Sequence, residues 1–388
     1  MHYITAGESH GPQLTAIIEG IPAGLHLDVE EINAALASRQ GGYGRGNRQQ
    51  IEHDTVEIVG GVRHQITMGG PVALVVKNRD HGNWGQIMDP VAPATPENSV
   101  RRVEKPRPGH ADLVGGMKYR HKDLRNVLER SSARETAIRV AVGNVCQQLL
   151  NQLGVKLVGY VKQVGPVSAA GNLTTDVDAI RSAISQNDMR VLDQSKVAEI
   201  HELIDETKRQ GDTLGGLIRV VVEDYPAGIG SYVSYDTKLD GKLAGAVMSM
   251  NAMKGVSIGD GFDAATSFGS QVMDAIDWSQ DTGWSRLSNH LGGIEGGMSN
   301  GMPIVVNAAM KPIPTLYHPL QTVDVNTKKV VKANVERSDT TAIAAASIVI
   351  ENVVAIELAK ALLETFNASN FQRLQADVQR YRNEFKEY

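Results

Sequence analysis

Four segments in the first half of this chain resemble four segments in its second half, and the matches fall in the same order along both halves. ERSSARETA at 129–137, for example, resembles ERSDTTAIA at 336–344. The other matched pairs are 17–25 with 221–229, 36–44 with 247–255, and 69–76 with 301–308. An ordered set of matches indicates duplication of a unit of roughly 150 residues. Coincidence between stretches rich in strand-forming residues is the alternative interpretation.

The duplication predicts one α/β (α+β) architecture built from two related halves, not two independent domains. The halves would cover about 1–153 and 211–366, and 155–210 would be an insertion of one strand and two helices. A cleft is expected where two related halves meet, and clefts are where small ligands usually bind.

Helix signals support this division of the chain. Ser132, with Glu135 three residues later, has the pattern of a capping box, and Gly154 ends the helical stretch that follows. A counterpart helix is expected after Asp339. The stretch at about 370–386 is highly charged, so we expect a helix on the surface there.

The charge and the cysteine count limit the classes of protein to which this chain can belong. Its 388 residues carry a net charge of −5, which disfavours a nucleic-acid partner. Cys146 is the only cysteine, so an intramolecular disulfide is impossible and a reducing compartment is indicated. The sequence has neither a signal-peptide pattern nor an apolar run of the ~18 residues that a membrane span needs. We therefore expect a soluble cytoplasmic protein with no membrane partner.

A loop rich in glycine and arginine, RQGGYGRGNR at 39–48, follows a helix that is predicted to begin at Asp28. Arg39, Arg45 and Arg48 offer planar, permanently charged donors that suit phosphate and carboxylate groups, and the glycines let the backbone approach a ligand closely. The loop therefore predicts an anion-binding clamp. A solvated surface loop and an RNA-contacting Gly-Arg tail are the alternatives, although such tails are usually longer, repetitive and terminal.

Further basic residues lie in short motifs elsewhere in the chain. Arg107 and His110 share a turn in RPGHAD, and Lys311 lies in MKPIPT. RSS at 130–132 and RSD at 337–339 each precede a predicted helix, whose free N–H groups favour anions. Together these motifs predict a pocket for a ligand with several negative charges.

Two histidines, His10 in GESHG and His110, lie beside glycine in polar turns. Imidazole titrates near neutral pH, so each is a candidate acid or base, with a structural role as the alternative. The spacing patterns of metal sites, P-loops and nucleophile elbows are absent from the sequence, so no metal site is expected. GDGFDA at 259–264 lacks the strand–turn–helix context of a dinucleotide site. The residues alone predict an enzyme-like pocket without naming its reaction.

The chain contains long motifs in a fixed order, namely GESHG, RQGGYGRGNR, RPGHADLVGGMKY, ERSSARETA, NAMKGVSIGDGF, GGIEGGMSNG, MKPIPT and RSDTTAIAAASIVIE. These motifs resemble the chorismate synthase family, from Tyr3 to about Leu363, as a single domain that spans 1–388. One position departs from the family pattern, because Ala344 stands where the family usually has a proline. We expect this alanine to ease continuation of the helix.

The resemblance implies a β-α-β sandwich fold, a homotetramer and a lyase of the shikimate pathway. The reaction would be the 1,4-anti elimination of phosphate from 5-enolpyruvylshikimate 3-phosphate, which gives chorismate. Reduced FMN would be required although there is no net redox change, and NADPH would serve only as an indirect reductant. The substrate and FMN together carry two phosphates and two carboxylates, which the clustered cations would balance.

The resemblance also implies roles for individual residues. His110 would protonate the departing phosphate, His10 would keep the reduced flavin in its working protonation state, and Asp339 would assist proton transfer at the flavin. The expected contacts with substrate or NADP are Arg39, Arg45, Arg48, Arg107 and Arg134. The expected FMN contacts are Arg130, Ser131, Ser132, Asn251, Ala252, Gly296, Lys311, Pro312, Ile313, Pro314, Thr315 and Arg337.

The favoured interpretation is a lyase that uses flavin reduced by another protein. Two alternatives stay open at this point. One is a flavin reductase that itself oxidises NADPH, although the sequence has no separate nicotinamide-binding fingerprint and no extra insertion. The other is a Gly-Arg nucleic-acid-binding module, which the acidic net charge disfavours.

Overall fold

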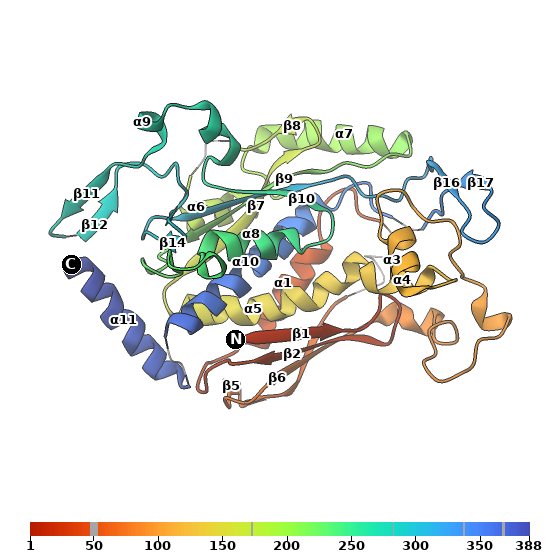
Figure 1. The fold of residues 1–388 in the computed structure, drawn as a ribbon, viewed down its shortest axis with the longest axis horizontal. Helices are drawn as coiled ribbons and strands as arrows, with labels where there is room; N and C mark the ends of the chain where they lie inside the picture. The colour runs from red at the N-terminus through yellow and green to blue at the C-terminus, as the bar shows by residue number, and fades with distance from the viewer. Residues whose placement is uncertain (47–52, 172–173, 282, 337, 367–368) are drawn as a thin grey trace.

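Two antiparallel sheets enclose a layer of helices in the computed structural model, which describes residues 1–46, 53–171, 174–281, 283–336, 338–366 and 369–388 (Figure 1). The first sheet has the order β1 (His2–Ala6), β2 (Gln13–Glu19), β6 (Val72–Lys77) and β3 (Val56–Gly60). The second has the order β10 (Met253–Ile258), β15 (Ile304–Met310), β9 (Gly216–Glu223), β7 (Lys156–Val164) and β8 (Val167–Ser168). The expected β-α-β sandwich is confirmed.

The layer between the sheets consists of α1 (Val29–Gln40), α5 (Thr136–Gln152), α8 (Leu239–Met248) and α10 (Ile343–Thr365). Helix α5 packs on β2 and β6, α10 packs on β7 and β9, and the two helices pack against each other. Most residues around α10 are apolar and buried, as a helix enclosed on all sides requires. Gly143 lets α5 and α10 approach closely, because a Cβ at this position would lie 2.4 Å from the Asn352 Cβ.

The strands of the first sheet alternate between a face on the helices and a face towards solvent. In β2, Leu14, Ala16 and Ile18 are buried against the helical layer. Ile17 between them points outward and is 42% exposed, and its direct partner in β1, Ile4, is 61% exposed. The outer face of this sheet therefore presents apolar side chains to solvent.

The two sheets have the same strand order when the strands are matched by their position in the chain. β1-β2-β6-β3 corresponds to β7-β9-β15-β10, and α1 and α5 correspond to α8 and α10. The matched sequence segments fall in corresponding elements, such as 69–76 in β6 and 301–308 in β15. We propose that the halves arose by duplication, with the second half beginning at β7 and not near residue 211. The insertion would then lie between β7 and β9.

The remaining elements surround this core. The other described helices are α3 (Asp112–Tyr119), α4 (Arg125–Ser131), α6 (Val177–Ile184), α7 (Val197–Arg209), α9 (Gly269–Val272) and α11 (Phe371–Glu387). The other described strands form the pairs β4 (Val62–Arg63) with β5 (Ile66–Thr67), β11 (Ile276–Ser279) with β12 (Gly283–Arg286), β13 (Ile294–Glu295) with β14 (Met298–Ser299), and β16 (Gln321–Val323) with β17 (Val330–Lys332). Within these residues, no helix is both long and apolar enough to cross a membrane.

The predicted start of α5 differs from the observed one. Ser132 caps only a short 3-10 turn, with its hydroxyl accepting from the Arg134 N–H at 3.3 Å, and α5 begins at Thr136. The Glu135 carboxylate accepts bonds from Thr5 and Arg139 in place of the expected capping-box bond, because β1 and the next turn of the helix lie within reach. The charged C-terminal helix is observed as α11, which lies along the outside of the molecule (Figure 1).

Candidate active site

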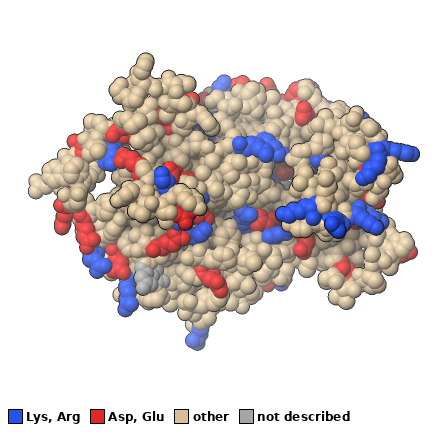
Figure 2. Space-filling model, in the orientation of Figure 1, with Lys and Arg blue, Asp and Glu red and all other residues tan. Residues whose placement is uncertain are grey.

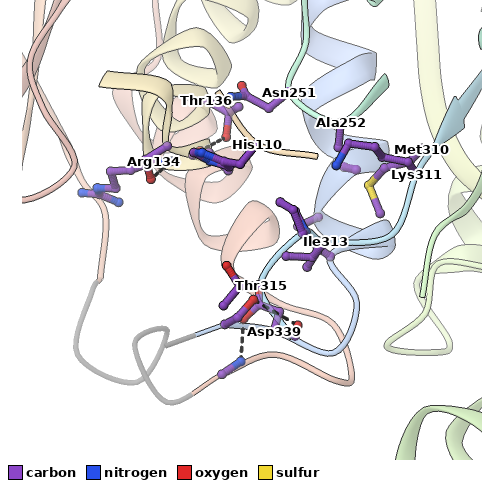
Figure 3. A pocket seen from close by; sticks show the side chains of 18 of the residues that line it. His110, Arg134, Thr136, Asn251, Ala252, Met310, Lys311, Ile313, Thr315 and Asp339 are labelled. Atoms are coloured by element: carbon purple, nitrogen blue, oxygen red, sulfur yellow. Dashed lines mark hydrogen bonds between the residues drawn. The ribbon is translucent and has the colours of Figure 1, made fainter. Parts of the chain in front are cut away.

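A cavity of about 750 Å³ is lined by segments from both halves of the chain (Figure 3). The first half contributes the end of α1, the loop 44–46, the turn at 107–111 and the junction of α4 with α5. The second half contributes 250–253, the segment after β15 and the start of α10. The cavity thus lies where the sequence predicts a cleft.

The lining combines an apolar wall with several cations. The apolar side chains include Met250, Met253, Met310, Ile313, Val349 and Ile350. The basic side chains are Arg39, Arg45, Arg107, Arg134, Lys208 and Lys311. On the face drawn in Figure 2, lysines and arginines gather over the half that holds α3 and α4, whereas acidic side chains are more frequent towards α11. Such a cavity suits an apolar ring system that carries anionic groups.

The glycine-rich loop is fixed to the segment that precedes α10. Arg45 Nη1 lies 3.3 Å from Asp339 Oδ2, and the Gly46 N–H donates to Asp339 Oδ1 at 2.6 Å. The Thr340 N–H donates to the Gly44 carbonyl at 2.9 Å. Gly44 has φ +81°, a left-handed conformation that favours glycine, and this turn brings Arg45 to the cavity. Arg45 and Asp339 are far apart in sequence, and their ion pair holds the loop and the segment before α10 together at the cavity.

Arg39 and Arg134 share one buried carboxylate, that of Asp54. Arg134 Nη1 donates to Asp54 Oδ2 at 2.7 Å, and Arg39 Nη1 lies 3.6 Å from the same oxygen. Arg39 Nε also donates to the Thr136 hydroxyl at 2.9 Å, and Arg134 Nε donates to Asn78 Oδ1 at 2.8 Å. These bonds hold both guanidinium groups at the base of the cavity wall.

His110 is paired with the buried carboxylate of Asp112, the first residue of α3. His110 Nδ1 lies 2.6 Å from Asp112 Oδ1, and Arg107 Nε donates to Asp112 Oδ2 at 2.9 Å. Arg107 Nη1 also donates to the Thr315 hydroxyl at 2.9 Å, which ties this turn to the second half. Burial alone would raise the pKa of Asp112, but hydrogen bonds and charges from His110 and Arg107 outweigh it and hold the pKa well below its ordinary value. Asp112 is therefore a permanent anion that orients the His110 ring.

The opposite wall is built around Asn251 and Lys311. Asn251 Nδ2 donates to the Ser131 carbonyl at 2.9 Å, and the Lys311 N–H donates to the Ala252 carbonyl at 3.0 Å. Burial, together with the nearby charge of Lys254, lowers the pKa of Lys311. Figure 3 shows Ala252, Met310 and Lys311 on one side of the cavity, His110 with Arg134 on the other, and Asn251 beside His110.

Not every residue expected at the site lines this cavity. The expected residues that do are Arg39, Arg45, Arg107, His110, Ser131, Ser132, Arg134, Asn251, Ala252, Lys311, Ile313, Pro314, Thr315 and Asp339. Among the residues that the structure describes, the lining does not include His10, Arg130, Pro312 or Gly296. Arg48 and Arg337 lie outside the described residues.

His10 is buried behind α4. Its Nδ1 lies 2.9 Å from Glu129 Oε1, its backbone N–H donates to Glu129 Oε2 at 2.8 Å, and its ring stacks on Trp84 at 3.7 Å. Burial raises the pKa of Glu129, but the bonds from His10 and the charge of Arg125 outweigh it, so the pKa is lowered. Arg130 instead donates to carbonyls of Thr5 and Gly7.

Sequence reasoning missed several residues that organise the site. Asp112 could have been found, because it lies two residues after His110 in the same motif. Asp54, Glu129 and Lys208 carry no local signal, since only the fold brings them to Arg134, His10 and the cavity.

Comparisons with known proteins give one consistent result. A family model described as chorismate synthase matches residues 1–363. The chain is 66% identical over 388 residues to a chorismate synthase of Lactiplantibacillus plantarum, with 100% of both chains covered. It is 70% identical over 386 residues to one of Limosilactobacillus fermentum, covering 100% of this chain and 99% of that one. A crystal structure of a chorismate synthase matches with a TM-score of 0.80 and 39% identity, covering 100% of this chain and 98% of that one.

Proposed function

This chain belongs to the chorismate synthase family, and on that premise we propose how its cavity performs the reaction. The reaction is the 1,4-anti elimination of phosphate from 5-enolpyruvylshikimate 3-phosphate to give chorismate, the last common step of the shikimate pathway. The enzyme is a carbon–oxygen lyase of aromatic amino-acid biosynthesis. The observation that carries the site proposal is the cavity in which His110, Asp339 and four arginines meet.

We propose that reduced FMN binds against the apolar wall of this cavity. Met310 and Ile313 offer apolar surface for a ring system, while Lys311 and Asn251 offer a cation and an amide for its polar groups. Ser131, Ser132, Ala252, Pro314 and Thr315 complete this side. Reduced FMN held there would supply electron density transiently to an elimination that has no net redox change. The contacts expected of Arg130, Pro312, Gly296 and Arg337 stay predictions.

The arginines would bind the anionic groups of the substrate. Arg39, Arg45 and Arg134 present permanent, planar donors, and their internal carboxylates hold them in place before the substrate arrives. Because part of their charge is already balanced, the site remains stable without substrate. The loop that carries Arg45 would also exclude water from the reacting atoms, which strengthens the charge interactions inside.

Proton transfer would rest on His110 and Asp339. The Nδ1–H of His110 donates to Asp112, which leaves Nε2 to give a proton to the phosphate as the bond from C3 to oxygen breaks. Asp339 would assist proton transfer at the flavin, which takes up the proton that leaves C6. His10 does not line the cavity, because its ring is buried against Trp84 and Glu129, and its role at the flavin stays a prediction.

Three further features are proposed on family resemblance. We propose a homotetramer, which the exposed apolar pair Ile4 and Ile17 supports, since such a face is usually covered in an assembly. We propose a cytoplasmic location, which the unpaired buried thiol of Cys146 supports. We also propose that NADPH acts only through a separate flavin reductase.

An anaerobic assay tests the function and its cofactor together. The protein is mixed with dithionite-reduced FMN and 5-enolpyruvylshikimate 3-phosphate, and phosphate and chorismate are followed in parallel. We expect both products to appear in equal amounts, and none with oxidised FMN. Absence of product from folded protein that binds FMN would overturn the proposed activity, and oxidation of NADPH by the pure protein would show that it reduces its own flavin.

A further inference from the structure

The arginines of the cavity differ from Lys208 in one respect. Each arginine that lines it has a carboxylate partner within the protein: Arg39 and Arg134 with Asp54, Arg107 with Asp112, and Arg45 with Asp339. Lys208 also lines the cavity, but within the described part of the chain its ammonium group has no hydrogen-bond or ion-pair partner. Lys208 therefore brings a positive charge that nothing in the described protein balances.

Helix α7 directs Lys208 towards the glycine-rich loop. His201, Ile204, Asp205 and Lys208 are spaced so that they lie on one face of this helix. The loop packs on the same face, because a Cβ added at Gly44 would lie 2.9 Å from Ile204 Cγ2. Lys208 is one turn beyond Ile204, so it reaches the cavity next to the point where the loop delivers Arg45.

Tyr43 fixes the loop to this face by two further contacts. Its ring stacks on His201 with centroids 4.0 Å apart, and its hydroxyl donates to Asp205 Oδ1 at 3.0 Å. His201 in turn is held by Asp188, with Nε2 2.9 Å from Oδ1. Helix α7 is thus a fixed outer wall for the loop, and the position of Lys208 relative to Arg45 is set by these packed contacts.

Helix α7 does not belong to the part of the chain that the two proposed halves share. α7 lies in the segment between β7 and β9, whereas the corresponding strands β1 and β2 are joined directly. The duplicated core therefore supplies the arginines, and the insertion supplies Lys208. A lysine offers a compact charge on a flexible stem, which suits an anion whose position changes during a reaction.

We propose that Lys208 binds an anionic group of the substrate, a phosphate or a carboxylate, beside Arg45. The assignment rests on the proposed function of the cavity. The substrate is favoured over FMN because Lys208 adjoins the loop of Arg45, whereas Asn251, Ala252 and Lys311 of the proposed flavin wall belong to other segments.

The test compares Lys208→Met, Lys208→Arg and a matched control, Lys196→Met. Lys196 directly precedes the same helix and pairs with Glu199 at 2.8 Å, and it is not part of the cavity lining, so it carries the same charge away from the cavity. With saturating reduced FMN, Lys208→Met is expected to raise the KM for 5-enolpyruvylshikimate 3-phosphate by about tenfold or more and to leave kcat within about twofold. Lys208→Arg should restore most of the KM, and Lys196→Met should match the wild type.

Each other outcome identifies what failed. An unchanged KM in Lys208→Met overturns the proposal while leaving the proposed function intact. A weaker affinity for FMN with an unchanged KM also overturns it, because the charge would then serve the cofactor. If the wild type gives no chorismate, the proposed function fails. In that case, calorimetric titration of the protein–FMN complex with 5-enolpyruvylshikimate 3-phosphate still tests the role of Lys208. Weaker binding by Lys208→Met than by the wild type would support the proposal, and equal affinities would overturn it.

Discussion

At the scale of single residues, the site depends on carboxylates that pair with its arginines and with His110. Asp54, Asp112 and Asp339 are each held by at least one arginine, and Asp112 also holds His110. A buried anion of this kind fixes a ring or a guanidinium in one orientation before the ligand arrives. The chemistry of the site therefore depends on residues that need not touch the substrate.

We predict that His110→Ala lowers kcat by at least ~100-fold, because general acid catalysis is lost. FMN should still bind, since Lys311, Asn251 and the apolar wall are unchanged. The measurement is steady-state turnover with reduced FMN, combined with an FMN titration of the same variant. Turnover close to that of the wild type would remove His110 from the mechanism.

Asp112→Asn is predicted to lower kcat with reduced FMN. The His110 ring loses the carboxylate that orients it, so its Nε2 is held less well for proton transfer. Asp176→Asn is the matched control, because Asp176 caps α6 through the Ala179 N–H and is not part of the cavity lining. A kcat equal to that of the wild type would mean that Asp112 does not hold His110 in its working orientation.

At the scale of elements, the contact between α7 and the loop sets the position of Arg45. Tyr43→Ala removes both the stack on His201 and the bond to Asp205, whereas Tyr43→Phe removes only the bond. We predict a rise of about three- to tenfold in the substrate KM for Tyr43→Ala and a smaller rise for Tyr43→Phe, because an exposed bond contributes little. Equal effects of both variants would show that stacking does not hold the loop.

The start of α10 corrects one expectation about Ala344. This residue is the second of α10, in the first turn, where the N–H groups have no partner within the helix. A proline is tolerated there, so an alanine does not ease continuation of the helix as the sequence suggested. Ala344→Pro is accordingly predicted to change the free energy of unfolding by no more than about 1 kcal/mol, measured by urea denaturation. A loss of several kcal/mol would show that the contact between Ala344 and Gly42 does not accommodate the ring.

At the scale of the whole molecule, the sequence indicated the layered fold and most of the charged residues that line the cavity. The long motifs identify Arg39, His110 and Asn251 because those residues lie in distinctive local patterns. The proposed start of the second half at β7 could not be found from the sequence, since β7 has little sequence likeness to β1 and only the sheet order aligns them. Lys208 was missed for a similar reason, because an exposed lysine on a helix has no local feature that points to a ligand.

The whole molecule should also lose stability in acid through Asp112 and Glu129, the buried carboxylates that pair with His110 and His10. The pKa values of Asp112 and Glu129 are lowered from ordinary values of 3.8 and 4.5, so both groups stabilise the folded state above those values. This stabilisation is lost as the pH falls below about 4 and the carboxylates take up protons. Urea denaturation at several pH values between 7 and 3 measures the effect.

Glu129→Gln isolates one of these two contributions. At neutral pH the variant should be less stable than the wild type, because His10 and Arg125 lose a charged partner. The difference should shrink as the pH falls, since the wild-type carboxylate is then protonated as well. The substitution also changes the contact that Glu129 makes with His10, so the comparison includes the double variant His10→Gln with Glu129→Gln. A constant difference across the pH range in both variants would mean that the charge of Glu129 does not contribute to stability.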